Sequence, residues 1–153
     1  MWIVKIGGSW INNPNLSNLI KNLQRLSNKD NIIIVNGGGS FSDSVRLVYE
    51  NKKMSEKTGN YIALKATELF SHLLKEIDKN ICLVDDIESL RLSNKMLKIW
   101  LPSMILKNDS TFIKNWESTS DSVAAWLHSK INSLGLLYVC LLYTSDAADD
   151  VLC

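Results

Sequence analysis

Met1-Trp-Ile-Val-Lys-Ile-Gly-Gly-Ser9 is the stretch from which the fold can be predicted. Trp2 to Ile6 is a short apolar run that ends at a pair of glycines. Such a run is typical of a strand buried on both faces, as in a parallel sheet. Lys5 stands inside the run, where its ammonium would lose hydration and would need a partner. The alternative is that Lys5 extends from an edge strand into water, past an ordinary Gly-Gly turn.

The turn after this strand favours an anion site. Gly7 and Gly8 allow backbone amides to come close to a ligand, and Ser9 can cap a helix or bind an oxygen atom. A lysine at the carboxyl end of a strand, followed by such a turn, suits a phosphate best. We therefore take Lys5, Gly7, Gly8 and Ser9 as candidate site residues.

A second glycine turn follows a second apolar run, Ile32 to Val35. It contains Gly37, Gly38 and Gly39, and three consecutive glycines cost backbone entropy unless the structure requires them. Close approach of phosphate oxygens to amides at a helix start is such a requirement. Arg46, in the helix predicted after this turn, could point either to solvent or back to the glycines.

The other predicted elements alternate between helices and strands. An amphipathic helix begins with Asn13 as cap and Pro14 in its first position, and its apolar face includes Leu16 and Leu26. The remaining predicted elements are a helix at about 41–50 with Val45 and Val48 toward the core, a helix at about 59–79, a strand at 81–84, a short helix at 87–92, a strand at 97–101, a helix from about 118 and a strand at 134–139. This alternation predicts an α/β fold, a three-layer αβα sandwich with a mainly parallel sheet.

Asp121 is a further candidate site residue. Ser118, Thr119 and Ser120 are cap residues, and Asp121 lies in the first helical turn, where the helix dipole favours a negative charge. That role alone could explain Asp121. However, ligands of parallel α/β sheets bind at the carboxyl ends of the strands, where Lys5, the two glycine turns and Asp121 would meet.

Composition narrows the function classes. The chain has 153 residues and a net charge of +1, with scattered Lys and Arg, so we expect one domain with no nucleic-acid or membrane surface. Sparse, unpaired cysteines indicate a reduced, cytoplasmic protein. The isolated His72 and His128 predict no metal site. Asp85 and Asp86 could form an acid/base pair or a metal site, but a solvated turn and a helix cap is the commoner arrangement.

The end of the chain is expected to be foreign. Residues 140–150 read Cys-Leu-Leu-Tyr-Thr-Ser-Asp-Ala-Ala-Asp-Asp. This run resembles the translation of a transposon-based sequencing adapter. We therefore assign 1–139 to the natural domain and 140–153 to a non-native tail, which is excluded from fold reasoning.

Three motifs in order resemble the amino-acid kinase family, which includes aspartate, glutamate and uridylate kinases. They are Val4-Lys-Ile-Gly-Gly-Ser9, Val35-Asn-Gly-Gly-Gly-Ser40 and Thr119-Ser-Asp-Ser-Val-Ala-Ala125. The resemblance covers about residues 1–139 and matches the N-terminal part of the family domain. Within the family, Trp116 to Trp126, Asp43 to Arg46 and Leu101 to Ser103 look most like a subgroup related to the aminomethylfuran phosphate kinases.

The resemblance implies a site for phosphoryl transfer from Mg-ATP, with ATP and Mg²⁺ as cofactors. Lys5 would contact the transferred group, the glycines of both turns would supply amides, and Asp121 would hold the catalytic lysines. Arg46 would bind a small-molecule carboxylate or phosphate acceptor. Asn36 stands where many members carry His, which leaves that acceptor contact open.

The resemblance also implies an incomplete domain. The nucleotide-binding segment with the second lysine would lie beyond Val139, so we predict that this chain is an inactive fragment of a parent that could form a homo-oligomer. Two alternatives stay open: a non-catalytic nucleotide-binding relative, and a dinucleotide-binding oxidoreductase. The second fits poorly, because neither turn reads Gly-x-Gly-x-x-Gly.

Overall fold

The computed structural model describes residues 1–141. A five-stranded sheet runs through the molecule in the order β3-β4-β2-β1-β5, and all of its pairings are parallel. The strands are β1 (Trp2–Ile6), β2 (Ile32–Asn36), β3 (Cys82–Val84), β4 (Lys98–Trp100) and β5 (Gly135–Val139). The predicted α/β fold with a parallel sheet is confirmed. Of the proposed foreign tail, only Cys140 and Leu141 lie within the described residues.

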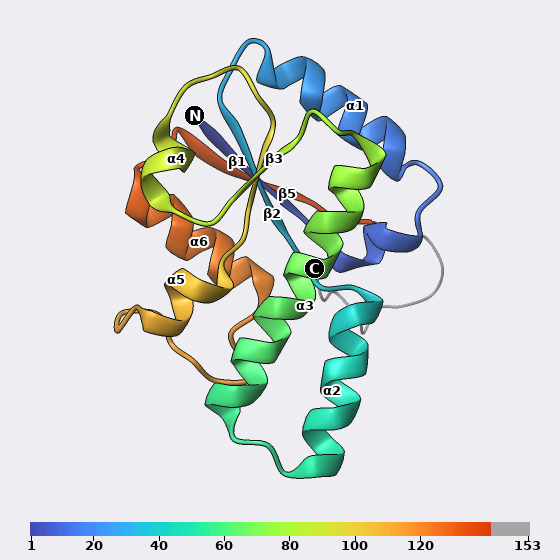
Figure 1. Ribbon diagram of the computed structural model, residues 1–153, viewed down its shortest axis with the longest axis vertical. Helices are drawn as coiled ribbons and strands as arrows, with labels where there is room; N and C mark the ends of the chain where they lie inside the picture. The colour runs from blue at the N-terminus through green and yellow to red at the C-terminus, as the bar shows by residue number, and fades with distance from the viewer. Residues whose placement is uncertain (142–153) are drawn as a thin grey trace.

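Helices cover both faces of this sheet, as Figure 1 shows. They are η1 (Gly8–Asn12), α1 (Leu16–Ser27), α2 (Ser40–Lys52), α3 (Glu56–Ile77), α4 (Ile87–Arg91), α5 (Ser103–Asn108) and α6 (Ser120–Ile131). Helix α1 and the carboxyl half of α3 lie on one face, while α4, α5 and α6 lie on the other. No helix in the described part of the chain is long and apolar enough to span a membrane.

The side chains of β1 alternate between two cores. Val4 and Ile6 pack with residues of α1 and α3, such as Ile20 and Phe70. Ile3 packs with α6 in the other core. Because successive side chains of a strand point to opposite faces, Lys5 shares the face of Ile3, which is the face covered by α6.

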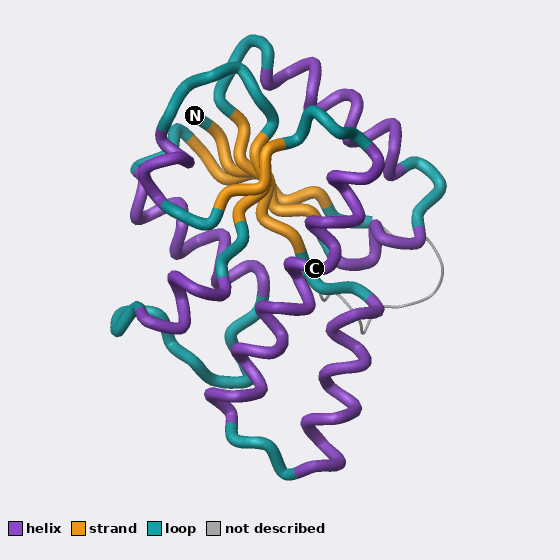
Figure 2. Tube along the Cα trace, in the orientation of Figure 1, coloured by secondary structure: helices purple, strands orange, loops and turns teal. Residues whose placement is uncertain are grey.

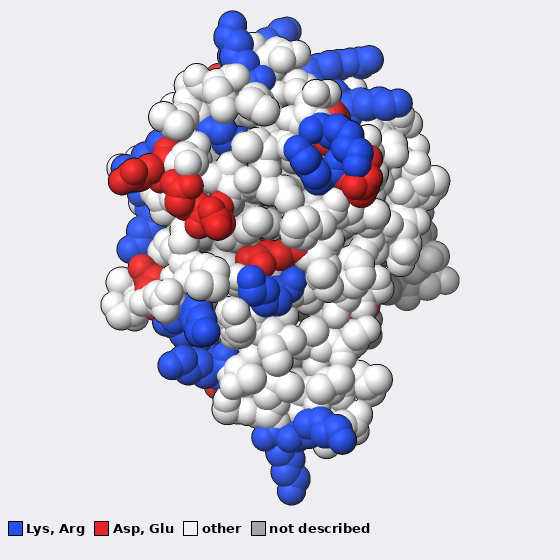
Figure 3. Space-filling view, viewed as in Figure 1, with Lys and Arg blue, Asp and Glu red and all other residues white. Residues whose placement is uncertain are grey.

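Helices α2 and α3 form a hairpin that extends beyond the carboxyl ends of the strands (Figure 2). The prediction that Val45 and Val48 face the core is wrong, since α2 has no buried residue and Val48 is 47% exposed. Helix α2 packs mainly along α3, with a smaller contact to η1. The view in Figure 3 shows little charge over α2, and scattered charges elsewhere.

Two helix boundaries differ from the prediction. Helix α1 begins at Leu16, because the Asn13 side chain accepts a hydrogen bond from the Asn15 amide in the preceding turn. Leu26, predicted to face the core, is 51% exposed. Helix α3 begins at Glu56, earlier than predicted, where the Ser55 side chain accepts a hydrogen bond from the Thr58 amide and caps the helix.

Asp86 caps a helix. Its side chain accepts a hydrogen bond of 2.7 Å from the Ser89 amide at the start of α4. Within residues 1–141, no group of three or more His, Cys, Asp or Glu residues could hold a metal ion. The commoner interpretation of Asp85 and Asp86, a turn with a cap, is the one that the structure supports.

Candidate active site

Lys5 is buried at the carboxyl end of β1. This strand lies between β2 and β5, so Lys5 has no open sheet edge along which to reach water. The residue is 1% exposed, and its Nζ lies 2.9 Å from Asp121 Oδ1. The alternative of a solvent-extended lysine on an edge strand is therefore wrong, and the expected partner of the buried ammonium is Asp121.

Asp121 reaches Lys5 from the first turn of α6. Its carboxylate is about a third exposed, so the pair joins a buried cation to an anion that keeps part of its hydration. Asp121 Oδ1 accepts no hydrogen bond from the described residues, so the contact is an ion pair without hydrogen-bond alignment. Partial solvation of the carboxylate lowers the desolvation cost that a fully buried pair would carry.

The two glycine turns touch each other through their backbones. A Cβ atom on Gly8 would lie 2.2 Å from the Gly39 nitrogen, and one on Gly37 would lie 2.5 Å from the Gly8 nitrogen. Gly39 also has a positive φ of 53°, which favours glycine over residues with a side chain. Only glycine backbones can approach this closely, so contact between the turns is a structural reason for these glycines, beside the phosphate approach expected from the sequence.

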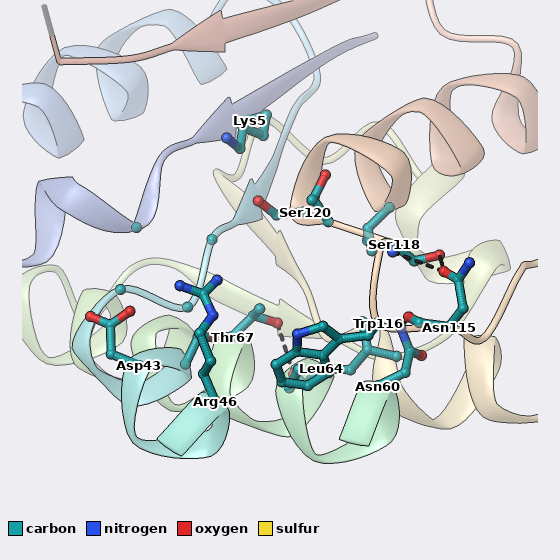
Figure 4. A pocket seen from close by; sticks show the side chains of 18 residues that line it. Lys5, Asp43, Arg46, Asn60, Leu64, Thr67, Asn115, Trp116, Ser118 and Ser120 are labelled. Carbon is teal, nitrogen blue, oxygen red and sulfur yellow. Dashed lines mark hydrogen bonds between the residues drawn. The ribbon is translucent and has the colours of Figure 1, made fainter. Parts of the chain in front are cut away.

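A cavity of about 370 Å³ opens beside these turns, and Lys5, Gly8 and all three glycines of the second turn line it (Figure 4). Arg46 lines it too. Figure 4 shows the Arg46 side chain pointing from α2 toward the glycine turn, which decides between the two predicted directions. The cavity thus gathers two cationic side chains and a set of backbone amides, a combination suited to phosphate oxygens.

Gly7, Ser9 and Asp121 do not line the cavity, and not every glycine that lines it has a free amide. The Gly7 amide donates to the Val139 carbonyl at 3.2 Å and the Gly37 amide donates to the Ile6 carbonyl at 2.8 Å. These two amides therefore extend the hydrogen bonding of the sheet. Ser9 is exposed and is not a lining residue. Among the predicted glycines, Gly8, Gly38 and Gly39 remain the best placed to offer amides to a ligand.

Asn36 anchors the second turn and does not line the cavity. It is buried, and its amide donates a 3.0 Å hydrogen bond to Ser71 Oγ on α3. This contact joins the end of β2 to the helix behind it. The sequence left open whether the residue at this position contacts the acceptor. In the structure, Asn36 supports the turn from behind.

Other cavity residues were not predicted from the sequence. They come from three places: the start of α2, one side of α3 and the loop before α6. The main polar and aromatic members are Asp43, Asn60, Thr67, Asn115, Trp116 and Ser118. Trp116 could have been suspected from the sequence, because it begins the segment that resembles one kinase subgroup. Asn60 and Thr67 could not have been found in this way, since nothing in a helical sequence shows which side will face a cavity.

Residues 1–139 match the sequence pattern of the amino acid kinase family. The chain belongs to this family. The predicted family resemblance is thus confirmed. The site described above combines two cationic side chains with two glycine turns.

One relative of known activity is [5-(aminomethyl)furan-3-yl]methyl phosphate kinase from Methanocaldococcus jannaschii. It is 32% identical to this chain over 130 residues, which cover 83% of the chain and 59% of the relative. The chain therefore spans less than two thirds of that protein's length. The match supports the subgroup that the sequence suggested.

The fold is similar to that of uridylate kinase from Archaeoglobus fulgidus. The crystal structure of that enzyme aligns with a TM-score of 0.70 at 18% identity, over 98% of this chain and 69% of the other. At this identity the similarity concerns the fold alone. It agrees with the parallel sheet and the helical layers of this amino acid kinase family member.

Proposed function

We propose that the protein transfers the terminal phosphoryl group of ATP to a small-molecule acceptor. The observation that carries the proposal is the buried Lys5 ammonium, paired with Asp121 and facing two glycine turns across one cavity. Phosphoryl transfer needs little covalent help from a protein. It needs the reacting groups to be positioned and their charge to be neutralised.

Each part of the site has a role in this proposal. An acceptor oxygen forms a bond to the terminal phosphorus of ATP while the bond from that phosphorus to the bridging oxygen breaks, and ADP leaves. Lys5 offsets the negative charge on the transferred group, and the amides of Gly8, Gly38 and Gly39 bind its oxygens. Asp121 acts through Lys5, by holding its ammonium at the end of β1.

In this proposal Mg²⁺ arrives bound to the phosphates of ATP. The described residues offer no cluster of carboxylates or histidines that could hold the ion alone. Mg²⁺ commonly binds through substrate phosphates and keeps several water ligands, so a dedicated protein cage is not needed. Gly8, Gly37 and Gly39 pack backbone against backbone at a place where any side chain would clash.

For the acceptor we propose a phosphate monoester of the aminomethylfuran type. This assignment follows the printed activity of the Methanocaldococcus relative. Arg46 supports it, because a guanidinium that points toward the glycine turns suits a phosphate with two parallel hydrogen bonds. The product would then be a diphosphate.

A non-catalytic nucleotide-binding relative is the competing proposal. Such a protein would need the glycine turns but would have no use for a desolvated lysine at the transfer point. Here Lys5 and Asp121 are both present and in contact. Family membership removes the support for the dinucleotide-binding oxidoreductase.

Replacing Lys5 with methionine tests the proposal. In the full-length gene product, we expect K5M to lower ATP-dependent phosphorylation of the acceptor by a factor of at least about 100, the lower end of what a preorganised electrostatic group contributes. ADP release measured with and without acceptor checks this. Lys5→Arg is the matched variant, since it keeps the positive charge of the side chain but replaces the compact ammonium with a planar guanidinium. Unchanged turnover by K5M would reject the role given to Lys5.

Three further predictions rest on the sequence. We predict that the 153-residue chain by itself shows no turnover, which the same ADP assay checks. A homo-oligomer of the full-length protein is checked by sedimentation, and a cytoplasmic location is checked by cell fractionation.

A further inference from the structure

Trp116 forms a flat wall of the cavity. Its indole lines the same space as Lys5 and Arg46, and in Figure 4 it lies between Arg46 and Asn60. The ring of Tyr49, on α2, stacks on it with the centroids 4.0 Å apart and the planes 4° from parallel. Because Tyr49 covers one face of the indole, a ring bound in the cavity can reach only the opposite face or the edge.

The helix beside this stack carries a glycine where the rings need room. Gly59 lies in the first part of α3, where alanine would favour the helix more. A Cβ atom at this position would lie 2.5 Å from Tyr49 Cδ2 and 3.2 Å from Trp116 Cε3. The backbone of Gly59 has no positive φ, so the aromatic stack is the feature that requires a glycine.

The loop that carries Trp116 is fastened on both sides. Asn60, which is 4% exposed, donates a 3.1 Å hydrogen bond from its side chain to the Asn115 carbonyl. The Ser118 amide donates to the Asn115 side chain at 3.0 Å. The indole is therefore held in place before any ligand arrives, and a preorganised ring binds with a smaller loss of conformational entropy.

We propose that Trp116 is the residue that selects acceptors carrying a flat aromatic ring. This inference rests on the proposed function, because it assigns the ring-binding part of the same acceptor site. The ring of the acceptor stacks on the face of Trp116 opposite Tyr49, while its anionic group reaches Arg46 and the glycine turns. Tyr49 and Gly59 are positioning residues, since they act only through the place of the indole.

The test compares two ligands that differ only in ring character. Furan-3-ylmethyl phosphate and cyclopentylmethyl phosphate have the same charge and similar size, but only the first can stack. We expect the 153-residue chain to bind the furan ligand about threefold to tenfold more tightly, the range of an aromatic pair. Isothermal titration calorimetry without ATP measures both affinities.

Variants identify the residue responsible. Trp116→Leu should bring the affinity ratio to about 1, and Trp116→Phe should keep most of it. The matched control is Trp126→Leu, because Trp126 also stacks on another ring, that of Trp100 at 5.7 Å, but does not line the cavity. It should leave the ratio unchanged. Gly59→Ala, which displaces the stack without removing it, should lower the ratio and decides the question if Trp116→Leu does not fold.

The inference would be overturned if the unmodified chain bound both ligands with equal affinity or bound neither. It would also be overturned if Trp116→Leu or Gly59→Ala left the affinity ratio unchanged. The proposed function fails by a different observation, namely no ATP-dependent phosphorylation of the acceptor by the unmodified full-length protein. A lost ring preference with normal kinase activity would thus reject the role of Trp116 alone.

Discussion

At the scale of the residue, the charge pair at the end of β1 shows why one of its members cannot be changed alone. Lys5 is 1% exposed, whereas the Asp121 side chain is 31% exposed. Removal of the partly hydrated carboxylate leaves a buried ammonium without a counter-charge. Removal of the ammonium leaves a carboxylate that water can still reach.

We therefore expect the two substitutions to differ in stability. Asp121→Asn should lower the free energy of unfolding by about 1–3 kcal/mol, less than the roughly 3–5 kcal/mol lost when a fully buried pair is broken. Lys5→Met keeps an apolar stem of similar volume and should change it by less than about 1 kcal/mol. Urea unfolding of the 153-residue chain measures both, and equal losses would contradict the account.

At the scale of the element, a second buried lysine joins a strand to a helix. Lys98 begins β4 and is 1% exposed. Its ammonium donates to the carbonyls of Ser89 at 2.8 Å and Leu90 at 3.2 Å, and also to that of Leu92. A cation at the carboxyl end of α4 satisfies carbonyls that lack helical partners and interacts favourably with the helix dipole.

Burial lowers the pKa of Lys98 below its ordinary value of 10.5, against the opposing effect of Cys82 and Asp86. The unfolded chain therefore binds a proton more readily at this residue than the folded chain does. Stability attributable to Lys98 should rise as the pH increases from below the folded pKa toward 10.5. The difference in unfolding free energy between the unmodified chain and Lys98→Met, measured from pH 7 upward, checks this; a difference that falls with pH would contradict it.

At the scale of the whole molecule, the contact between the glycine turns joins the first and second strands at the edge where the cavity opens. The turns are about 30 residues apart in sequence, and β1 and β2 bring them together by pairing Ile6 with Asn36. The site therefore depends on the sheet register, since a shift of one residue would turn Lys5 away from α6.

A pair of adjacent glycines tests this dependence. Gly8→Ala would place a Cβ atom 2.2 Å from the Gly39 nitrogen, so we expect a loss of at least about 1–3 kcal/mol as the turns separate. Gly7→Ala is the control, because its Cβ atom would come no closer than 3.6 Å to the Val139 carbonyl and its φ of −61° suits alanine. Thermal unfolding of both variants checks this, and equal effects would contradict it.

The local parts of this protein could be predicted from its sequence. The apolar runs and glycine turns predicted a parallel sheet, and the position of Lys5 predicted a buried cation that needed a partner. Parallel strands and their following helices were expected to bring Asp121 to the same edge, and the family resemblance implied that it holds the lysine. These features follow from chain chirality and from the cost of an unpaired buried charge, which act on any sequence alike.

Which surfaces meet depends on how the elements pack. Val48 and Leu26 have the spacing of core residues, yet both are exposed, because α2 packs mainly on α3 and α1 turns Leu26 to solvent. Trp116 and Asn60 become cavity residues only when a loop far along the chain closes over α3. Periodicity shows that a helix has an apolar side, but the neighbour that covers each position is set by how the elements pack.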